Sequence, residues 1–325
     1  MRIFFDNGVV VEGRGFRLLV DPFKPFDPSR YDAVLVTHGH SDHVTRAIKR
    51  AAAVVATAET FEVIKIRYGV RPPRRVVVRP GSRVEVAKGV AVHALNAGHV
   101  LGSVMYLVET PEGTIGLTGD FNTADSNIVR GADVLEADVL VMEATYGSRE
   151  YVFPPRERLY AQVAELVESG KAPAAILVGP LGKGQELARL LSARRLYVHP
   201  RIAELNRALG IAGGKEYRAG VGPGDAVLLP LNAEPPPGSV AVELSGHFAS
   251  PEARKAAEAA GVLGIPLSNH ADFPGLLEFA LRSRARRVYT VYGRAGELAK
   301  WLNRLGLRAA VIPPRGQTEL TQWLT

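Results

Sequence analysis

Short apolar runs separated by turn residues fill most of the first 143 residues. Runs such as FRLLV, AVLV and TIGL are rich in Val, Leu and Ile, and an Asp or Thr closes each of them. This length and composition predict β-strands rather than helices. We therefore expect the first half of the chain to be rich in sheet.

From about residue 149 the pattern changes to helical segments that alternate with apolar strands. A helix is predicted over 155–169, followed by the strand AAILVG, the helix GQELARLLSARR, the strand LYVHP and a helix over 201–209. Such βαβ alternation predicts a small parallel sheet. Towards the end, the helices PGLLEFALRSR and GELAKWLNRLG flank the strand RVYTVYG, and a final strand and helix follow.

Composition narrows the chemistry that the chain can carry. None of the 325 residues is a cysteine, so thiolate ligands, thiol nucleophiles and disulfides are excluded, and only His, Asp and Glu remain for a transition metal. No stretch has the length and apolarity needed to span a bilayer, which predicts a soluble, cytoplasmic protein without membrane contact. The net charge of +7 fits an acidic partner such as nucleic acid, but the scarcity of Asn, Gln and Met equally fits a thermophile with a charged surface.

The densest chemical pattern is HGHSDH, which follows a predicted strand and precedes a helix predicted over 44–53. Alternate residues of an extended segment face the same way, so His38 and His40 can bind one ion. Asp42 and His43, turned by the start of the helix, can bind a neighbouring ion. Imidazole and carboxylate ligands without sulfur suit Zn²⁺, with Mn²⁺ as a substitute, so one or two such ions are expected.

Two later segments place further candidate ligands at strand ends. His99 stands next to Gly98, which lets the backbone approach closely, and Asp120 ends an apolar strand, where its carboxylate could bridge two ions. Taken alone, either residue is as typical of a turn or a cap. Their order after HGHSDH favours metal binding.

With these residues in view, the chain resembles the metallo-β-lactamase superfamily, whose signature is HxHxDH followed by a later His and a later Asp. The resemblance implies an α/β fold of the αββα sandwich type. It also implies two metal sites, and the ligands are His38, His40 and His99 at one, Asp42 and His43 at the other, and Asp120 bridging them.

The segment EATYG, which begins at Glu143, resembles the Glu-(Ala/Ser)-Thr-(Tyr/Phe)-Gly motif of the β-CASP nucleases, the branch that cuts DNA or RNA. The resemblance implies a metallo-β-lactamase domain over 1–148, a shortened β-CASP-like parallel α/β cap over 149–261, and a return to the first domain over 262–325. Without it, Glu143 could equally be a buried structural acid.

The segment Ser268-Asn-His270 resembles the second motif of this branch, Ser-x-His. The resemblance implies that His270, oriented by Glu143, protonates the leaving oxygen while Asp120 orients the attacking water. Imidazole suits this task because its ordinary pKa lies near working pH. The alternative is a histidine in the turn before a helix.

The third motif departs from the family pattern. Ribonucleases of the branch carry Val-His-Gly-Glu, in which the His is a metal ligand, whereas this chain has Tyr292 at that position. Members resembling Artemis and the crosslink-repair exonucleases also lack the His, so the departure favours DNA and leaves the second ion less fully held. From Asp120 onward the chain is similar to exonucleases associated with DNA ligase, which implies repair partners such as a ligase or a helicase.

Further substrate contacts are predicted from Lys183, Ser268 and Tyr292. Lys183 lies in a Gly-rich turn before a helix, where it and the backbone amides could hold a phosphate, although a flexible turn explains the glycines equally well. The sequence thus predicts a metal-dependent nuclease, with a DNA exonuclease in repair as the first hypothesis. An RNA-processing nuclease of the β-CASP type and an inactive nucleic-acid-binding paralogue are the alternatives.

Overall fold

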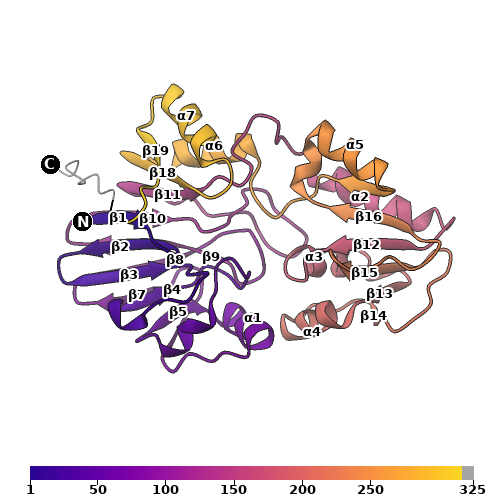
Figure 1. Cartoon of the computed structure of the whole chain (residues 1–325), viewed down its shortest axis with the longest axis horizontal. Helices are drawn as coiled ribbons and strands as arrows, with labels where there is room; N and C mark the ends of the chain where they lie inside the picture. Colours follow the sequence, from indigo (N-terminus) through magenta and orange to yellow (C-terminus); the bar gives the residue numbers. More distant parts are fainter. Residues whose placement is uncertain (317–325) are drawn as a thin grey trace. The chain divides into compact units, whose positions relative to one another are not determined.

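The computed structural model describes residues 1–316, and the chain divides into two compact units (Figure 1). The first unit contains Met1–Thr123, Gly131–Ser148 and the described residues from Pro274 onward. The second contains Ala124–Arg130 and Arg149–Phe273. The helix expected at the end of the sequence falls in 317–325, outside the described residues.

The described part of the first unit contains two sheets. Sheet A has the order β1 (Arg2–Phe5), β2 (Val9–Gly13), β3 (Phe16–Val20), β4 (Ala33–Leu35), β5 (Val54–Thr57), β6 (Arg75–Val78). Sheet B has the order β19 (Ala309–Val311), β18 (Arg287–Val291), β11 (Val139–Glu143), β10 (Gly113–Leu117), β9 (Val104–Thr110), β8 (Val90–Asn96), β7 (Arg83–Ala87).

The pairing in sheet B brings several strand ends to one edge. Strand β9 is antiparallel to both β8 and β10, while β11 is parallel to β10 and β18. The carboxyl ends of β8, β10, β11 and β18 therefore leave the sheet at the same edge. The loops that follow these strands carry most of the chemistry predicted for this unit.

The two sheets pack face to face through a shared apolar core. Alternate residues point into it, such as Val9 and Val11 of β2 and Val92 and Ala94 of β8. Tyr106 of β9 reaches across the interface, where its hydroxyl donates to the backbone oxygens of Val36, at 3.0 Å, and Val55, at 3.1 Å.

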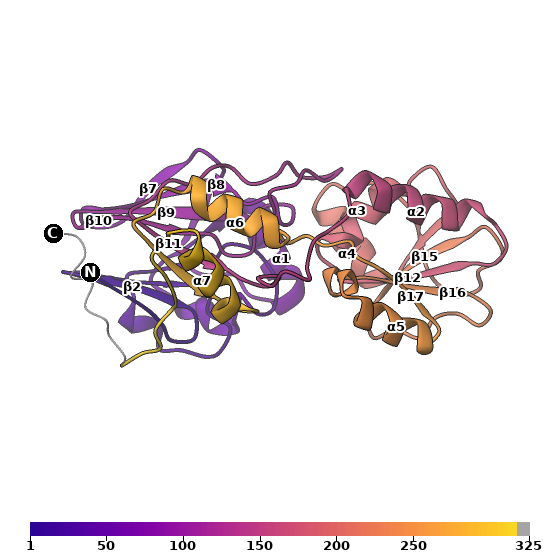
Figure 2. The ribbon, with the colours of Figure 1, turned by 90° about the horizontal axis from the view of Figure 1, so that it is seen from above.

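Helices cover both outer faces. On sheet A, Phe61 and Ile64 of α1 (Ala58–Tyr68) pack on Val10 and Leu19. On sheet B, α7 (Ala295–Arg304) contacts β18 and β19, and α6 (Phe273–Arg282) lies beside α7 (Figure 2). The ring of Phe279 in α6 meets the ring of Phe121, in the loop after β10, at 4.4 Å between centroids. The predicted mixed α/β fold with an αββα sandwich is confirmed.

The second unit holds a third sheet in which every pair of strands is parallel. Its order is β14 (Lys215–Glu216), β13 (Leu196–Val198), β15 (Ala226–Pro230), β12 (Ala174–Val178), β16 (Val240–Leu244), β17 (Val262–Ile265). The helices of this unit are α2 (Arg156–Glu168), α3 (Lys183–Leu190), α4 (Pro200–Ala208) and α5 (Pro251–Ala259). The central strands β12 and β15 are buried along their whole length, which explains their unbroken apolar sequence.

Two local features differ from the sequence-based expectation. Strand β17 pairs with β16, so 262–273 lie in the second unit although we placed the return to the first at 262. The helix expected over 44–53 is a short 3-10 helix, η2 (Arg46–Arg50). Its backbone bonds span three residues, as from the Ile48 N–H to the Thr45 oxygen.

No helix within residues 1–316 is long and apolar enough to cross a membrane.

Replacing Tyr106 by Phe tests how the sheets are joined. We expect the free energy of unfolding to fall by about 1–3 kcal/mol, because the substitution removes the hydroxyl donor of the buried Val36 oxygen, whereas the Val55 oxygen keeps the Val36 N–H. Denaturant unfolding followed by circular dichroism measures this loss, and an unchanged slope would show that the surface exposed on unfolding is the same. Wild-type stability in the variant would contradict the assigned role.

Candidate metal centre

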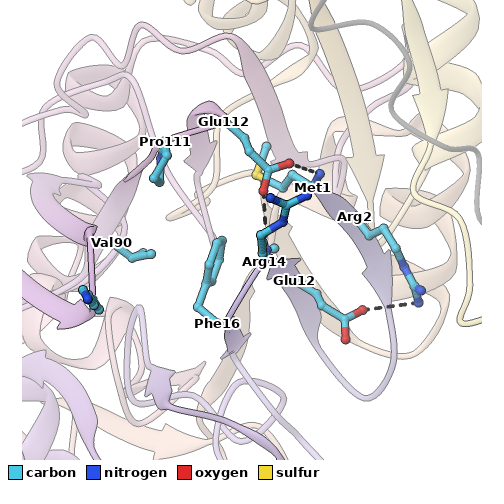
Figure 3. A pocket seen from close by; sticks show the side chains of 10 residues that line it. Met1, Arg2, Glu12, Arg14, Phe16, Val90, Pro111 and Glu112 are labelled. Atoms are coloured by element: carbon cyan, nitrogen blue, oxygen red, sulfur yellow. Dashed lines mark hydrogen bonds and ion pairs between the residues drawn. The ribbon is translucent and has the colours of Figure 1, made fainter.

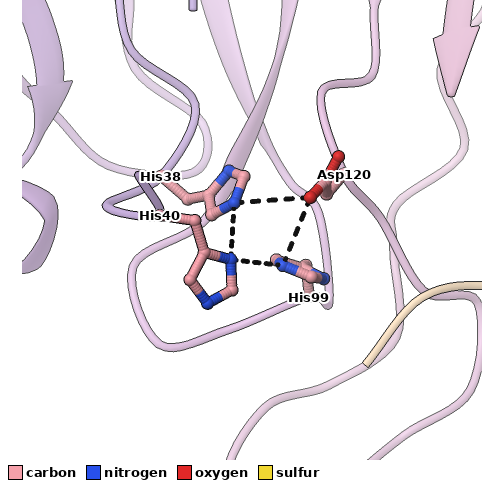
Figure 4. A group of neighbouring side chains, drawn as sticks. All are labelled: His38, His40, His99 and Asp120. Carbon is pink, nitrogen blue, oxygen red and sulfur yellow. Dashed lines mark hydrogen bonds and ion pairs between the residues drawn. The ribbon is translucent and has the colours of Figure 1, made fainter. Parts of the chain in front are cut away.

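Three histidines and one aspartate converge at the strand ends of the first unit (Figure 4). His38 Nε2 lies 2.9 Å from His40 Nδ1, which lies 3.2 Å from His99 Nε2. Asp120 Oδ2 is 3.5 Å from His38 Nε2 and 3.6 Å from His99 Nε2. The residues come from loops that follow β4, β8 and β10, so both sheets contribute to the cluster.

The spacing of these four atoms fits a single metal ion. Four ligands at the Zn–N and Zn–O distances of 2.0–2.2 Å stand about 3.4 Å from one another in a tetrahedron. The four separations given above, from 2.9 to 3.6 Å, bracket this value. His38, His40, His99 and Asp120 therefore have the geometry to hold one divalent ion.

A second set of contacts keeps His38 in the form that binds a metal. Its Nδ1 lies 3.0 Å from Thr37 Oγ1, which leaves Nε2 directed at the cluster. Burial, followed by the nearby His43, lowers the pKa of His38 well below its ordinary value. The imidazole is thus neutral at pH 7, as metal ligation requires.

Asp120 connects this cluster to His43. Asp120 Oδ1 lies 3.3 Å from His43 Nε2, while Oδ2 faces His38 and His99. Burial alone would lower the pKa of His43, but the carboxylates of Asp120 and Asp21 outweigh it and raise this pKa well above its ordinary value. Asp42 lies further out, with Oδ2 at 3.8 Å from His43 Nε2 and a side chain 75% exposed.

Asp21 is the site residue that our sequence analysis missed. Its Oδ2 accepts from Thr37 Oγ1 at 2.7 Å and lies 2.9 Å from His43 Nδ1, and its Oδ1 accepts from the Thr37 N–H at 2.8 Å. Asp21 orients His43 directly and orients His38, a member of the four-residue cluster, through Thr37. Asp21 directly follows the strand β3, the same pattern that pointed to Asp120, but its position before Pro22 is equally typical of a turn.

Tyr292 lies against the His43 side of the site. The rings of Tyr292 and His43 are 5.6 Å apart between centroids, and Phe5 packs edge-on to Tyr292 at 5.9 Å. Burial, followed by the nearby carboxylates, raises the pKa of Tyr292 well above its ordinary value, so the phenol is neutral. Its backbone has a φ of 63°, a conformation that a bulky residue adopts only where its surroundings hold it.

Glu143 ends β11 and is buried in the same unit. Its Oε1 accepts from the Phe121 N–H at 2.9 Å, and its Oε2 accepts from the Thr145 N–H at 3.3 Å. Through Phe121 it fixes the turn that carries Asp120. This contact is the structural role that the sequence left open beside a catalytic one.

Two glycines allow the loops to come together. A Cβ on Gly119, whose φ is 52°, would stand 2.6 Å from Thr37 Oγ1. A Cβ on Gly98, whose φ is 67°, would stand 2.4 Å from the Asn122 oxygen. Both positions need glycine, because the left-handed backbone and the close approach exclude other side chains.

A separate cavity of about 750 Å³ lies in the first unit (Figure 3). Glu112 and Phe16 are among the residues that line this cavity, and Glu112 forms an ion pair with the amino group of Met1. Its lining residues include none of the candidate ligands. The cavity therefore does not belong to the metal centre.

Comparison with known proteins places this geometry in a family. Residues 2–202 match the model of the β-lactamase superfamily domain. The chain belongs to the β-lactamase superfamily. The resemblance to its metal-dependent members is confirmed, and homologues of the chain lie in the β-CASP nuclease branch.

Two curated relatives are similar over different parts of the chain. A protein named probable DNA ligase, from Opitutus terrae, is 31% identical over 88% of this chain and 29% of its own length. RNase aCSPSF2 of Saccharolobus solfataricus is 28% identical over 51% of this chain and 39% of its own length. The chain thus spans well under half of either relative.

A solved structure has the same overall fold. It is a protein of unknown function from Enterococcus faecalis, with a TM-score of 0.71 and 14% identity over 97% of this chain and 98% of its own. At 14% identity, this likeness supports the fold of the chain and nothing about its function.

Three other predicted site residues lie in the second unit. Lys183 is the first residue of α3, where burial lowers the pKa of its ammonium group. Ser268 is buried, and its Oγ accepts from the His270 N–H at 3.0 Å. The substrate contacts of Lys183 and Ser268 and the catalytic role of His270 stay predictions.

Removal of one imidazole from the cluster of His38, His40, His99 and Asp120 should weaken its binding of a metal ion. We expect wild-type protein to keep at least one zinc ion per chain after dialysis and His99→Ala to keep markedly less, because the variant loses one of the four ligands. Metal content is measured by plasma mass spectrometry. His93→Ala is the matched control, because His93 lies outside the site and pairs with Glu109 at 2.9 Å. Equal metal in wild type and His99→Ala would contradict the assignment.

Proposed function

We propose that this protein is a metal-dependent nuclease that hydrolyses phosphodiester bonds of DNA. The observation that carries the proposal is the position of Asp120 between three imidazoles, with one oxygen toward His38 and His99 and the other toward His43. A shared carboxylate is the ligand expected between two neighbouring metal ions, and paired ions are typical of enzymes that cleave phosphate esters.

The chain supplies a separate group for each ion. His38, His40 and His99 would hold the first, His43 and Asp42 the second, and Asp120 both. Bound Zn²⁺, or Mn²⁺ in its place, would offset phosphate charge and lower the pKa of a coordinated water to about 7. Asp120 orients the attacking water, and His270 gives a proton to the leaving oxygen, so that the chain's own residues control both ends of the reaction.

DNA is the preferred substrate in this proposal because of Tyr292. A neutral, buried phenol beside His43 occupies the position at which ribonucleases of the β-CASP branch carry a ligand histidine. The relative named as a DNA ligase also matches over more of the chain than the relative named as an RNase, 88% against 51%. These observations favour an exonuclease that works in repair beside a ligase or a helicase.

RNA cleavage is the second candidate. The similarity to RNase aCSPSF2 and the EATYG segment favour it. An RNA substrate would use the same ions and the same water, so the two candidates are separated by comparing cleavage of matched DNA and RNA.

An assay with end-labelled single- and double-stranded DNA and RNA, in Zn²⁺ or Mn²⁺, tests the proposal. We expect wild type to shorten DNA and Asp120→Asn to lose at least about a hundredfold in rate, because the amide cannot serve both ions. His93→Ala controls for loss of a histidine elsewhere. The length of the products gives the polarity of cleavage.

The result can contradict the proposal in two ways. Faster cleavage of RNA than of DNA would favour the second candidate. Nucleic acid bound by metal-loaded wild type but never cut would instead identify an inactive binding protein.

A further inference from the structure

A buried carboxylate in the second unit stands apart from the metal centre. Glu186 lies on α3 and is 0% exposed. An acid so placed is costly unless its oxygens are compensated by cations or hydrogen-bond donors. The groups that contact Glu186, at its carboxylate or its backbone oxygen, come from three other segments of the unit.

Each oxygen of Glu186 has a partner. Arg156 Nε pairs with Oε1 at 3.3 Å, and the hydroxyl of Tyr160 also donates to Oε1. Asn269 Nδ2 donates to Oε2 at 2.9 Å. The backbone oxygen of Glu186 accepts from Asn127 Nδ2 at 3.0 Å, which connects the 124–130 segment to the same residue.

Two of these partners hold the segment that carries His270. Asn269 directly precedes His270, and Arg156 Nη1 and Nη2 both donate to the Ser268 oxygen, at 2.9 and 2.8 Å. Two guanidinium donors on one carbonyl are charge-assisted bonds that define direction as well as distance. The residues immediately before His270 are therefore fixed in position and orientation.

The chain beyond His270 is held by the same neighbouring segment. The Phe153 N–H donates to Asp272 Oδ2 at 3.1 Å, and the Phe273 N–H donates to the Tyr151 oxygen at 2.9 Å. Residues 151–156 thus hold the backbone on both sides of His270. Little freedom is left to the backbone that carries the imidazole.

A purely stabilising role does not account for this arrangement. Arg156 is 9% exposed in its side chain and Glu186 is 0% exposed, and ion pairs this deep usually give less stability than apolar side chains of similar size. The pair instead defines a geometry. Arg156 fixes the Ser268 oxygen, and Glu186 fixes the Asn269 side chain.

We propose that Arg156 and Glu186 are positioning residues for His270. This inference rests on the proposed function, in which His270 passes a proton from its ring to the leaving oxygen. The new bond forms between the water oxygen and phosphorus, the bond to the leaving oxygen breaks, and its electron pair is neutralised by that proton. A displaced imidazole would slow proton transfer without affecting the metal centre.

The test uses two DNA substrates of one sequence, both with the full protein. One has ordinary phosphodiesters, and the other carries a bridging sulfur in place of the departing oxygen at the bond that wild type cuts. A thiolate leaves without protonation, so sulfur removes the need for His270. His270→Ala is the reference variant, and it should be slow on the first substrate and close to wild type on the second.

Arg156→Lys keeps the charge beside Glu186 but loses the fork to Ser268. We expect kcat on ordinary DNA to fall about 10- to 100-fold, the effect of a misplaced catalytic group, with KM and metal content unchanged. On the sulfur substrate the variant should approach wild type. Arg194→Lys, which loses a guanidinium paired with Glu168 in the same unit, is the matched control and should resemble wild type on both.

Each outcome bears on one of the two proposals. Equal losses on both substrates for Arg156→Lys, beside a normal His270→Ala pattern, would overturn the positioning role. Wild type that cuts neither substrate would overturn the proposed function instead. If Arg156→Lys does not fold, Asn269→Ala removes the other connection to Glu186, and its rates must show the same selective loss.

Discussion

The division of the Asp120 carboxylate between the pair His38 and His99 and the single imidazole of His43 is the interaction on which the metal centre of the first unit depends. Asp120 is 5% exposed, and a buried carboxylate without compensation would destabilise the fold. His43, whose pKa the acids raise, supplies part of that compensation, and the Nε2 atoms of His38 and His99 lie 3.5 and 3.6 Å from the same carboxylate. The loops at this edge of the sandwich are therefore drawn to one point, and the site exists because the two sheets meet face to face.

A layer of contacts behind the ligands keeps them in place. Asp21 holds His43 and Thr37, and Thr37 in turn contacts His38, so one buried acid orients both sides of the site. Glu143 plays a similar part for the turn that carries Asp120, through the Phe121 N–H. The left-handed backbone of Gly119 lets that turn approach Thr37. The orientation of the ligand side chains therefore depends on the residues packed behind them as well as on the ligands themselves.

The second unit follows the same physical rule with different chemistry. Glu186 is a buried acid whose partners lie on separate segments, and compensating it fixes where those segments stand. Arg156 extends this order to Ser268 through two short bonds. In both units a costly buried charge is converted into defined geometry, because the charge tolerates only a few arrangements of its neighbours. In the first unit this order holds Asp120, and in the second it holds the backbone that carries His270; both are proposed catalytic residues.

The sequence by itself determined the sheet-rich first half, the parallel sheet of the second unit and the candidate ligands, because these depend on periodicity and on rare residue types in a fixed order. It did not reveal Asp21, whose local pattern is that of a turn before proline, nor the pairing of β17 with β16, which places 262–273 in the second unit. It also gave no sign that Glu186, in an ordinary amphipathic helix, would be fully buried. Only the tertiary structure decided these points, because each depends on contacts between residues far apart in the chain.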